Sequence, residues 1–404
     1  MRDPREEESS LKAETIEAPR SEKSSFRPDI QGLRAIAVVL VILVHASVPG
    51  FEGGYIGVDV FFVISGFVIT GLLLRQPERG IGRNLAHFYV RRIRRIVPAA
   101  TLTLVTTVVA AYALLGANFA PQLLGDVRWA ALFGANFRLI NTGSNYFIPG
   151  VAPSLVTHFW SLAVEEQFYL VYPLIVFSLI RLAPATHRIR MLAGFLILAI
   201  ALSSWWSYHL TPVNPVAAYY SPFTRFWQLA LGGLVALAPV AWARRSPLIN
   251  SIGAGIALLA IGLAALRLNA YSTYPGLLAW WPSAASAVLL FTGQASLRGA
   301  PASWLSWRPL RYVGDISYSL YLWHFAWLML PLQLVHPISS PGARIAEVAG
   351  ATVCAILSYH FVENPVRHSN LLARDAWATG LLLAICLVLS WDSTFVIGRL
   401  AHVS

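Results

Sequence analysis

Eleven apolar runs divide this chain, and each is long enough to cross a lipid bilayer. A transmembrane helix needs about 17–25 predominantly apolar residues. Because lipid offers no hydrogen-bond partners to the backbone, such runs fold as helices that satisfy their own backbone groups. The runs fall near 33–49, 57–74, 97–116, 159–180, 191–208, 226–242, 249–266, 276–295, 314–334, 345–362 and 376–396. The sequence therefore predicts an all-α polytopic membrane protein with about eleven transmembrane helices, the last being an extra C-terminal span.

Composition and charge support this class. Only 12% of the 404 residues are charged, against about 25% in soluble domains. The net charge of +11 would suggest nucleic acid in a soluble protein, but here the basic residues flank the apolar runs and indicate topology. With the N-terminus in the cytoplasm, 24 of the 30 lysines and arginines fall on inner segments. We therefore expect a cytoplasmic N-terminus, an extracytoplasmic C-terminus, the lipid bilayer as a partner, and no nucleic acid.

Three regions are predicted along the chain. Residues 1–27 hold seven of the 19 acidic residues and cannot bury a core, so they are expected to form a disordered cytoplasmic tail. Residues 28–368 form the membrane domain, and 369–404 form the extra helix with a short outer tail. The mixed segment 123–140 carries four polar or charged residues and is interpreted as an interfacial or re-entrant helix, with a twelfth span as the alternative. The two cysteines lie in apolar runs without metal-ligand spacing, so no metal site is predicted.

Arg34 and His45 stand eleven residues apart on the first apolar run. At 100° per residue, eleven residues make three turns plus about 20°, so both side chains emerge on one helix face about 16 Å apart. Arginine at the edge of a span can reach the interface. A histidine well inside a span needs a polar partner or cavity, which makes His45 a functional candidate.

An acidic residue, Asp59, begins the second apolar run, just after the predicted hairpin turn that follows His45. A carboxylate in this position could orient or charge the imidazole, as it does for a catalytic histidine. The neighbouring glycines have a simpler interpretation, which is close packing of helices.

Four arginines fall within five residues before the third run: Arg91, Arg92, Arg94 and Arg95. One interpretation is an anchor that stops transfer and reaches lipid phosphates. The other is a site for an anionic cytosolic donor, because guanidinium groups bind phosphate through two parallel hydrogen bonds. Helical spacing would let Arg91, Arg94 and Arg95 share a face.

The fourth run holds the densest group of polar residues in any span. Glu165 and Glu166 are adjacent and diverge by about 100° on a helix, so at least one carboxylate must face a polar interior. Tyr169 follows one turn later. A structural network between helices and a polar active cavity both account for this group.

Two later runs repeat the pattern. Ser317 opens the ninth run and His324 lies within it, where an aromatic-rich helix makes a simply packed histidine the alternative to a functional one. Glu363 precedes Pro365, which is expected to stop the tenth helix. Glu363 could cap that end, although an acid at a helix C-terminus opposes the helix dipole.

Taken together, these motifs resemble the acyltransferase-3 family of integral-membrane acyltransferases. Any one of these motifs is weak evidence, but five or six of them in the same order are specific to the family. Together they cover about residues 26–368. The matching segments are Phe26-Arg-Pro-Asp-Ile-Gln-Gly-Leu-Arg34 with His45, the Gly-Val-Asp-Val-Phe-Phe-Val-Ile-Ser-Gly-Phe run at 57–67, the arginines at 91–95, Trp160-Ser-Leu-Ala-Val-Glu-Glu-Gln-Phe-Tyr169, Ser317-Tyr-Ser-Leu-Tyr-Leu-Trp-His324 and Glu363-Asn-Pro365.

The resemblance implies transfer of an acyl group, often acetyl, from cytosolic acyl-CoA to a hydroxyl of a cell-surface glycan, lipid-linked saccharide or glycolipid, in the inner (cytoplasmic) membrane. Acyl-CoA would be a co-substrate, with no permanently bound cofactor. Carried over to this sequence, His45 would be the general base and Arg34 its motif partner. The arginines at 91–95 would hold the donor. Glu165 and Glu363 would be further polar residues that activity requires.

The opening motif resembles a subgroup fused to an extracytoplasmic SGNH-type domain, and the chain departs from that pattern. After the eleventh run only about eight residues remain, without a Gly-Asp-Ser nucleophile motif. Three explanations stay open, namely a truncated chain, a separate SGNH-type partner, and a membrane domain that suffices alone.

Two other classes of protein compete with the enzyme. In a proton-coupled transporter or flippase, the intramembrane His, Asp and Glu would form a relay, but no internal repeat of the kind typical of transporters is visible. A structural scaffold does not explain so many ionisable groups at the edges of spans. The sequence therefore favours the acyltransferase.

Overall fold

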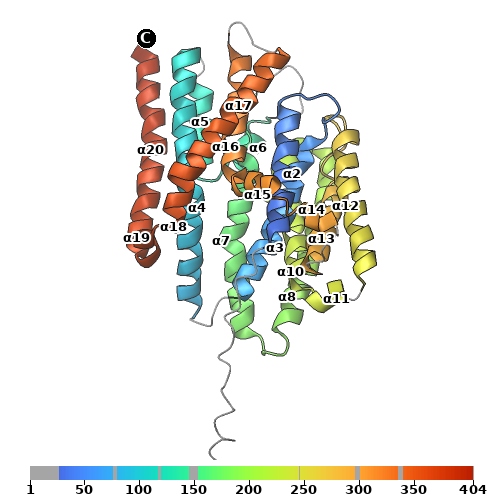
Figure 1. The fold of residues 1–404 in the computed structure, drawn as a ribbon. Coiled ribbons are helices and arrows are strands. Elements are labelled where there is room, and N and C mark those ends of the chain that lie inside the picture. Colours follow the sequence, from blue (N-terminus) through green and yellow to red (C-terminus); the bar gives the residue numbers. More distant parts are fainter. Residues whose placement is uncertain are drawn as a thin grey trace, which may run out of the picture.

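The fold is a bundle of helices, and the part of the chain that the structure describes contains no strand (Figure 1). The structure is a computed structural model, which describes residues 27–75, 80–116, 120–144, 153–244, 246–295, 301–334 and 340–403. The predicted all-α polytopic membrane class is confirmed. The predicted tail at 1–27 lies outside the described residues except for residue 27.

Eight of the described helices are long and apolar enough to cross a membrane. In chain order they are α2 (Pro28–His45), η1 with α3 (Gly54–Leu74), α4 (Ile81–Leu115), α7 (Phe159–Leu182), α8 (Arg188–Val213), α12 (Pro247–Arg267), α17 with its continuation (Pro341–His368) and α20 (Ala376–Ala401, within a helix of Ala376–Val403).

Three predicted spans coincide with shorter helices. They are α10 (Phe226–Leu237), α13 (Trp280–Thr292) and α16 (Ser317–Met329), of 12, 13 and 13 residues. Proline interrupts two of these runs, because Pro239 and Pro331 follow the ends of α10 and α16 and cannot continue a helix. These three helices are buried within the bundle, and their crossing of the membrane stays a prediction.

Short helices connect the long ones. They are α9 (Pro215–Tyr220), η3 (Pro222–Thr224), α11 (Val240–Arg244), η4 (Gly293–Ala295), α14 (Pro301–Trp304), α15 (Arg308–Asp315), η5 (Pro331–Gln333) and α19 (Asn370–Arg374). The segment predicted as interfacial or re-entrant forms two more, α5 (Ala120–Ala131) and α6 (Ala135–Asn141), with a turn at Phe133. At 1.5 Å per residue neither can cross a bilayer, which favours the interfacial interpretation over a twelfth span.

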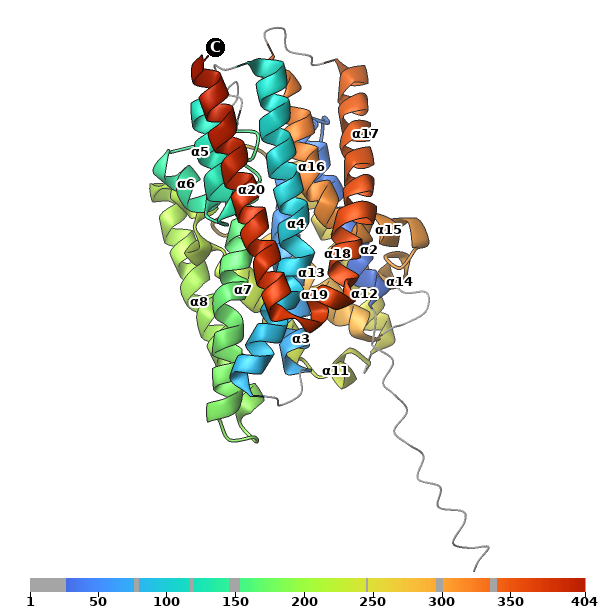
Figure 2. The ribbon, with the colours of Figure 1, turned by 90° about the vertical axis from the view of Figure 1, so that its left-hand side faces the viewer.

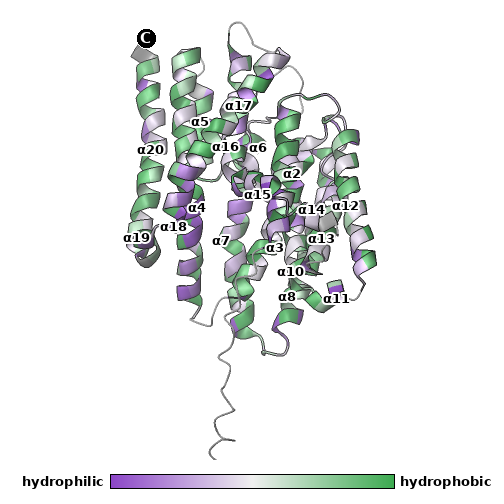
Figure 3. Ribbon diagram, viewed as in Figure 1, coloured by the Kyte–Doolittle hydropathy of each residue, from purple (hydrophilic) through white to green (hydrophobic). Residues whose placement is uncertain are grey.

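The third span is longer than predicted. Helix α4 has 35 residues and begins at Ile81, so the four arginines lie on the helix itself and not in a loop before it. Arginine is a good helix former, which explains why the helix continues through the charged cluster. Figure 3 shows this hydrophilic segment on the lower part of α4. Helix α20 packs along α4, as both ribbon views show (Figure 1, Figure 2).

The predicted stop at Pro365 is wrong. Helix α17 (Pro341–Ser358) passes into a π-helical turn (Tyr359–Glu363), which is followed directly by α18 (Asn364–His368). Pro365 sits in the first turn of α18, directly after the π-helical turn. The helix therefore continues through the proline instead of stopping at it.

Close contact of helix backbones holds α3 against α10. A Cβ added at Gly66 would lie 1.8 Å from the carbonyl oxygen of Leu229, and one added at Gly232 would lie 1.9 Å from that of Val63. Glycine at both positions lets the helices approach this closely. The close packing that the sequence suggested around Asp59 is therefore confirmed at Gly66.

We expect Gly66→Ala to destabilise the protein. The added methyl group would force α3 and α10 apart, and overpacking of this kind costs about 1–3 kcal/mol. Thermal unfolding in detergent micelles measures the change. Gly262→Ala in α12 is the matched control, because its Cβ would meet nothing within 4 Å. A Gly66→Ala protein as stable as the Gly262→Ala protein would contradict this account.

Candidate active site

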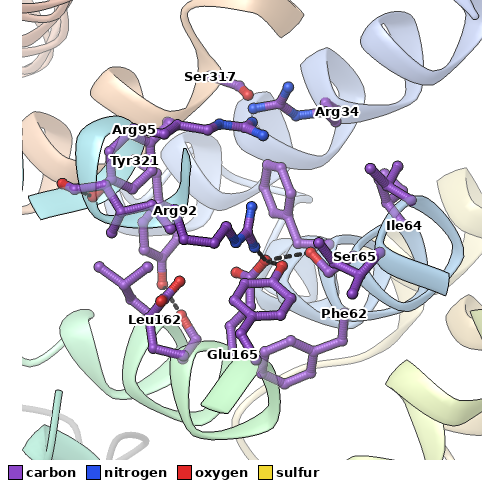
Figure 4. A pocket seen from close by; sticks show the side chains of 18 of the residues that line it. Arg34, Phe62, Ile64, Ser65, Arg92, Arg95, Leu162, Glu165, Ser317 and Tyr321 are labelled. Carbon is purple, nitrogen blue, oxygen red and sulfur yellow. Dashed lines mark hydrogen bonds and ion pairs between the residues drawn. The ribbon is translucent and has the colours of Figure 1, made fainter. Parts of the chain in front are cut away.

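An internal cavity of about 280 Å³ lies where α2, α3, α4, α7 and α16 meet. It brings together seven of the predicted site residues from four separate helices, and Figure 4 shows the surrounding side chains. These are Arg34, Arg92, Arg95, Glu165, Glu166, Tyr169 and Ser317. Further polar residues of the wall are Gln31, Ser65, Ser161, Tyr318, Tyr321 and Arg367.

Glu165 is the centre of a hydrogen-bonded network in this cavity. Its Oε1 accepts hydrogen bonds from the hydroxyl groups of Ser65 and Tyr169. The guanidinium of Arg92 lies 4.0 Å from the same oxygen and 3.5 Å from the centroid of the Tyr169 ring. The carboxylate is thus held by three side chains from α3, α4 and α7.

Two cationic groups face each other across the cavity. Figure 4 shows the side chains of Arg34 and Arg95 extending toward one another from α2 and α4, and their charges repel. Arg34 donates a hydrogen bond to Gln31 Oε1 at 2.9 Å. An anion between two such groups would relieve their repulsion, so this arrangement favours an anionic ligand.

Three buried polar atoms of the cavity residues have no hydrogen-bond partner in the described part of the chain. They are Arg92 Nε, Glu166 Oε1 and Ser317 Oγ. Buried polar groups in native proteins are nearly always hydrogen-bonded, and an exception needs an explanation. A polar occupant, either water or a ligand, provides one.

The arginine cluster divides into two parts, which corrects the predicted common face. Arg92 and Arg95 line the cavity. Arg94 instead donates to the backbone carbonyls of Val366, Arg367 and Ser369, at 3.2, 2.6 and 2.7 Å. The end of α18 lies against Arg94, and the last carbonyls of a helix lack partners within the helix. Arg91 is exposed and hydrogen-bonded to His87. Only two of the four predicted donor arginines therefore face the cavity.

Three histidines form a cluster beside the cavity. His45 Nδ1 lies 3.0 Å from His324 Nε2, and the His158 ring lies 5.5 Å from that of His324. His158 and His324 are fully buried and His45 partly so. Helix α2 ends at His45, so this residue is the last of its helix. His324 is thus buried and in direct hydrogen-bond contact with His45.

Hydrogen bonding assigns the tautomers of this pair. His324 Nδ1 lies 3.1 and 2.8 Å from the carbonyl oxygens of Leu320 and Tyr321, so it carries the proton and donates. Its Nε2 is then an acceptor, and Nδ1 of neutral His45 donates to it. The lone pair of neutral His45 is therefore on Nε2, the nitrogen that would act as a base.

Tyr321 forms the wall between the cavity and the histidines. Its side chain lines the cavity, and its ring lies 5.5 Å from that of His324. The hydroxyl bonds to Ser161 Oγ at 2.5 Å and donates to the His158 carbonyl at 2.9 Å. The cavity and the histidine cluster are thus neighbours that share the Tyr321 side chain.

Asp59 lies in a different cluster, which corrects the expected pairing with His45. Its carboxylate accepts hydrogen bonds from Arg225 at 3.0 Å and from Gln228 and Tyr274. Both charged residues are 1% exposed. A carboxylate buried this deeply needs a cation and further donors to offset its desolvation, and Arg225 supplies the charge.

We expect Asp59→Asn to destabilise the protein by about 3–5 kcal/mol, because it leaves the Arg225 guanidinium buried without a counter-charge. Thermal unfolding in micelles measures the loss. Glu347→Gln is the control, since its partner Arg344 is the more exposed of that pair and can reach water. Equal unfolding temperatures for Asp59→Asn and the unmodified protein would refute a structural role for the pair.

Glu363 is buried and does not cap a free helix end. Its Oε2 accepts a hydrogen bond from Ser319 Oγ at 2.8 Å, across from α16. It is the last residue of the π-helical turn, and such turns occur frequently at functional sites. Glu363 connects the tenth predicted span to the helix that carries Tyr321 and His324.

Several residues of the site escaped the sequence interpretation. His158 lies two residues before Trp160, and nothing local indicated its contact with His324. Arg225 is buried, and nothing in its local sequence indicated that it pairs with Asp59. Arg367 is exposed and lies on the cavity wall. No group of three potential metal ligands occurs among the described residues.

These features define an integral-membrane protein whose helices enclose a polar, cationic cavity next to a histidine cluster. A family model described as an acyltransferase domain, acyltransferase-3, matches residues 27–391. The chain therefore belongs to the acyltransferase-3 family, and the predicted resemblance is confirmed.

Two relatives illustrate the similarity. The chain is 32% identical over 366 residues to "Peptidoglycan O-acetyltransferase OatA" of Listeria monocytogenes, covering 85% of this chain and 56% of the relative. It is 29% identical over 349 residues to "O-acetyltransferase OatA" of Staphylococcus aureus, covering 85% and 57%. The chain spans about half the length of the curated relatives it matches. No solved structure matches the chain.

Proposed function

We propose that this protein transfers an acyl group, with acetyl the expected one, from cytosolic acyl-CoA to a hydroxyl of a cell-surface glycan. The relatives are named for O-acetyl transfer, and in one case to peptidoglycan, so a peptidoglycan-like saccharide is the acceptor we favour. The cytoplasmic membrane is the proposed location. A separate extracytoplasmic SGNH-type partner stays a prediction.

One observation carries this proposal, namely that the cationic cavity and the histidine cluster share the Tyr321 wall. We assign the cavity to the donor. Its volume of about 280 Å³ is near the lower limit of ligand pockets, so it suits the acyl-thioester arm. The phosphates of the donor would lie toward Arg92, Arg95 and the exposed Arg367.

The chemistry follows from this assignment. His45 Nε2 removes the proton of the acceptor hydroxyl, and the hydroxyl oxygen attacks the thioester carbonyl carbon. The carbon–sulfur bond breaks, and the leaving CoA thiolate takes a proton from His45. Tyr321 must move for the thioester and His45 to meet. An acyl group held covalently on a histidine or serine is the alternative route.

Sealed vesicles that contain the purified protein test this function. Radiolabelled acetyl-CoA is supplied on the side where the N-terminus lies, and an N-acetylhexosamine oligosaccharide on the other. We expect labelled ester to appear on the oligosaccharide only when both are present. If unacetylated oligosaccharide crosses the vesicle membrane and no ester forms, the protein is a flippase and the proposed acyl transfer is wrong.

A further inference from the structure

A second cavity, of about 310 Å³, lies at another place in the bundle. We call it the tyrosine cavity, after the three rings of Tyr219, Tyr220 and Tyr274 that line it. The end of α8, helix α9 and the segment that follows α12 form its walls. The remaining lining residues are Thr211, Pro212, Pro215, Val216, Ala270, Ser272 and Thr273.

The tyrosine cavity lies at the end of the bundle where α2 ends. Tyr55, in the short helix η1 that follows the turn after His45, packs against Tyr274 with ring centroids 4.8 Å apart. Its hydroxyl donates to the Asn269 carbonyl at 3.2 Å. The first turns of α2, with Arg34, instead line the cavity assigned to the donor. The two cavities therefore open at different levels of the membrane domain.

Aromatic side chains separate the two cavities. Trp160 contacts Tyr219 and Tyr220, with ring centroids 4.8 and 5.4 Å apart. On its other side Trp160 contacts Phe62, a residue of the donor cavity, at 6.1 Å. His158 lies two residues before Trp160, at the N-cap of α7, and contacts His324 and Phe325 instead. The tyrosine cavity thus lies beside the reaction centre, not within it.

The lining residues indicate the class of ligand. None of them is charged, and the nearby Arg225 is neutralised by Asp59 and lies 4.9 and 5.4 Å from the Tyr219 and Tyr274 ring centroids. A phosphate would need a free cation, and a lipid chain would not need hydroxyl groups. A neutral sugar needs what is present, because its hydroxyls bond to serine and threonine and its C–H faces pack on the apolar side chains of the exposed rim.

The shape of the tyrosine cavity agrees with this ligand. Its floor is buried, with Tyr219, Tyr220 and Tyr274 at most 3% exposed. Its rim is exposed at Pro212, Pro215, Ala270 and Thr273. A rigid floor of rings below an open rim can admit one sugar ring of a longer chain while the rest of that chain stays outside.

We propose that the tyrosine cavity is a subsite for a neutral sugar ring of the acceptor glycan, one that neighbours the sugar receiving the acyl group. That the bound sugar belongs to the acceptor glycan rests on the proposed function. That the cavity binds a sugar does not depend on it. Contacts with a remote part of a substrate help to orient its reacting part. The subsite would therefore select chains over single sugars.

A binding measurement tests the subsite without any catalysis. The full chain in lipid nanodiscs is titrated with a β-1,4-linked N-acetylglucosamine tetramer, with saturation-transfer NMR as the readout. Ala270→Trp fills the exposed rim and should weaken binding at least tenfold. Leu277→Trp introduces the same side chain in the same segment between α12 and α13. Leu277 is exposed and does not line the cavity, so this variant should bind the tetramer as the unmodified protein does. Absence of saturable binding, or equal binding by both variants, would overturn the subsite.

Kinetics separate this proposal from the proposed function. In the acyl-transfer assay, Ala270→Trp should raise KM for the tetramer at least tenfold while KM for acetyl-CoA and the rate with a monosaccharide acceptor stay unchanged. If the unmodified protein binds the tetramer but transfers no acyl group, the subsite stands and the proposed function fails. If transfer occurs and Ala270→Trp leaves KM for the tetramer unchanged, the subsite fails alone.

Discussion

Replacing His45 by alanine is expected to lower the rate of acyl transfer by about 10²–10⁴-fold, the range that a positioned general base contributes. The hydrogen bond between His45 Nδ1 and His324 Nε2 fixes the His45 ring and directs its lone pair to Nε2. Alanine removes that lone pair without placing a new charge in the membrane. Transfer of labelled acetyl from acetyl-CoA to the glycan, measured in membranes with matched amounts of protein, gives the rate.

Controls distinguish loss of the base from loss of the fold. His187→Ala removes an exposed histidine outside the cluster and should leave the rate unchanged. Added imidazole should restore part of the activity of the His45→Ala protein, since His45 is partly accessible. Full acylation by a normally inserted His45→Ala protein would remove the general-base role.

The second large effect concerns the donor. We expect Arg92→Gln and Arg95→Gln each to raise KM for acetyl-CoA about 10–100-fold, because a hydrogen bond to a charged group contributes about 1.5–3 kcal/mol. Glutamine keeps an N–H donor on a shorter side chain and loses the charge. Initial rates over a range of acetyl-CoA concentrations measure the change.

Arg91→Gln is the matched control on the same helix. Arg91 is exposed and does not line the cavity, so its replacement should leave KM unchanged. Topology is checked in parallel by protease protection. If all three variants kept the donor KM while the orientation of α4 reversed, the arginines would be a membrane anchor and not a donor site.

Local patterns in the sequence predicted much of this fold. Runs of apolar residues located eight long helices, because in lipid a backbone must satisfy its own hydrogen bonds. The spacing of Arg34 and His45 placed both on one helix, α2, which the structure confirms. Helical arithmetic also required a polar interior for Glu165 or Glu166, and both line the cavity.

Contacts between distant segments could not be predicted in this way. Asp59 follows His45 closely in the chain, yet its partner is Arg225, 166 residues away. Arg94 resembles its neighbours in sequence, and only the carbonyls at the end of α18 distinguish it from Arg92 and Arg95. The histidine cluster joins α2, α16 and the start of α7, which no single motif contains. Tertiary packing determines each of these pairings.

The π-helical turn at Tyr359–Glu363 acts as an inserted residue in an otherwise continuous helix. One extra residue rotates everything beyond it by about 100° relative to an uninterrupted α-helix. The helical segments before Tyr359 and after Glu363 thus have different rotational phases. The Arg367 side chain on the cavity wall and the carbonyls that hold Arg94 both belong to the second phase, so the length of this segment, as much as its residue types, determines which groups meet the arginines of α4.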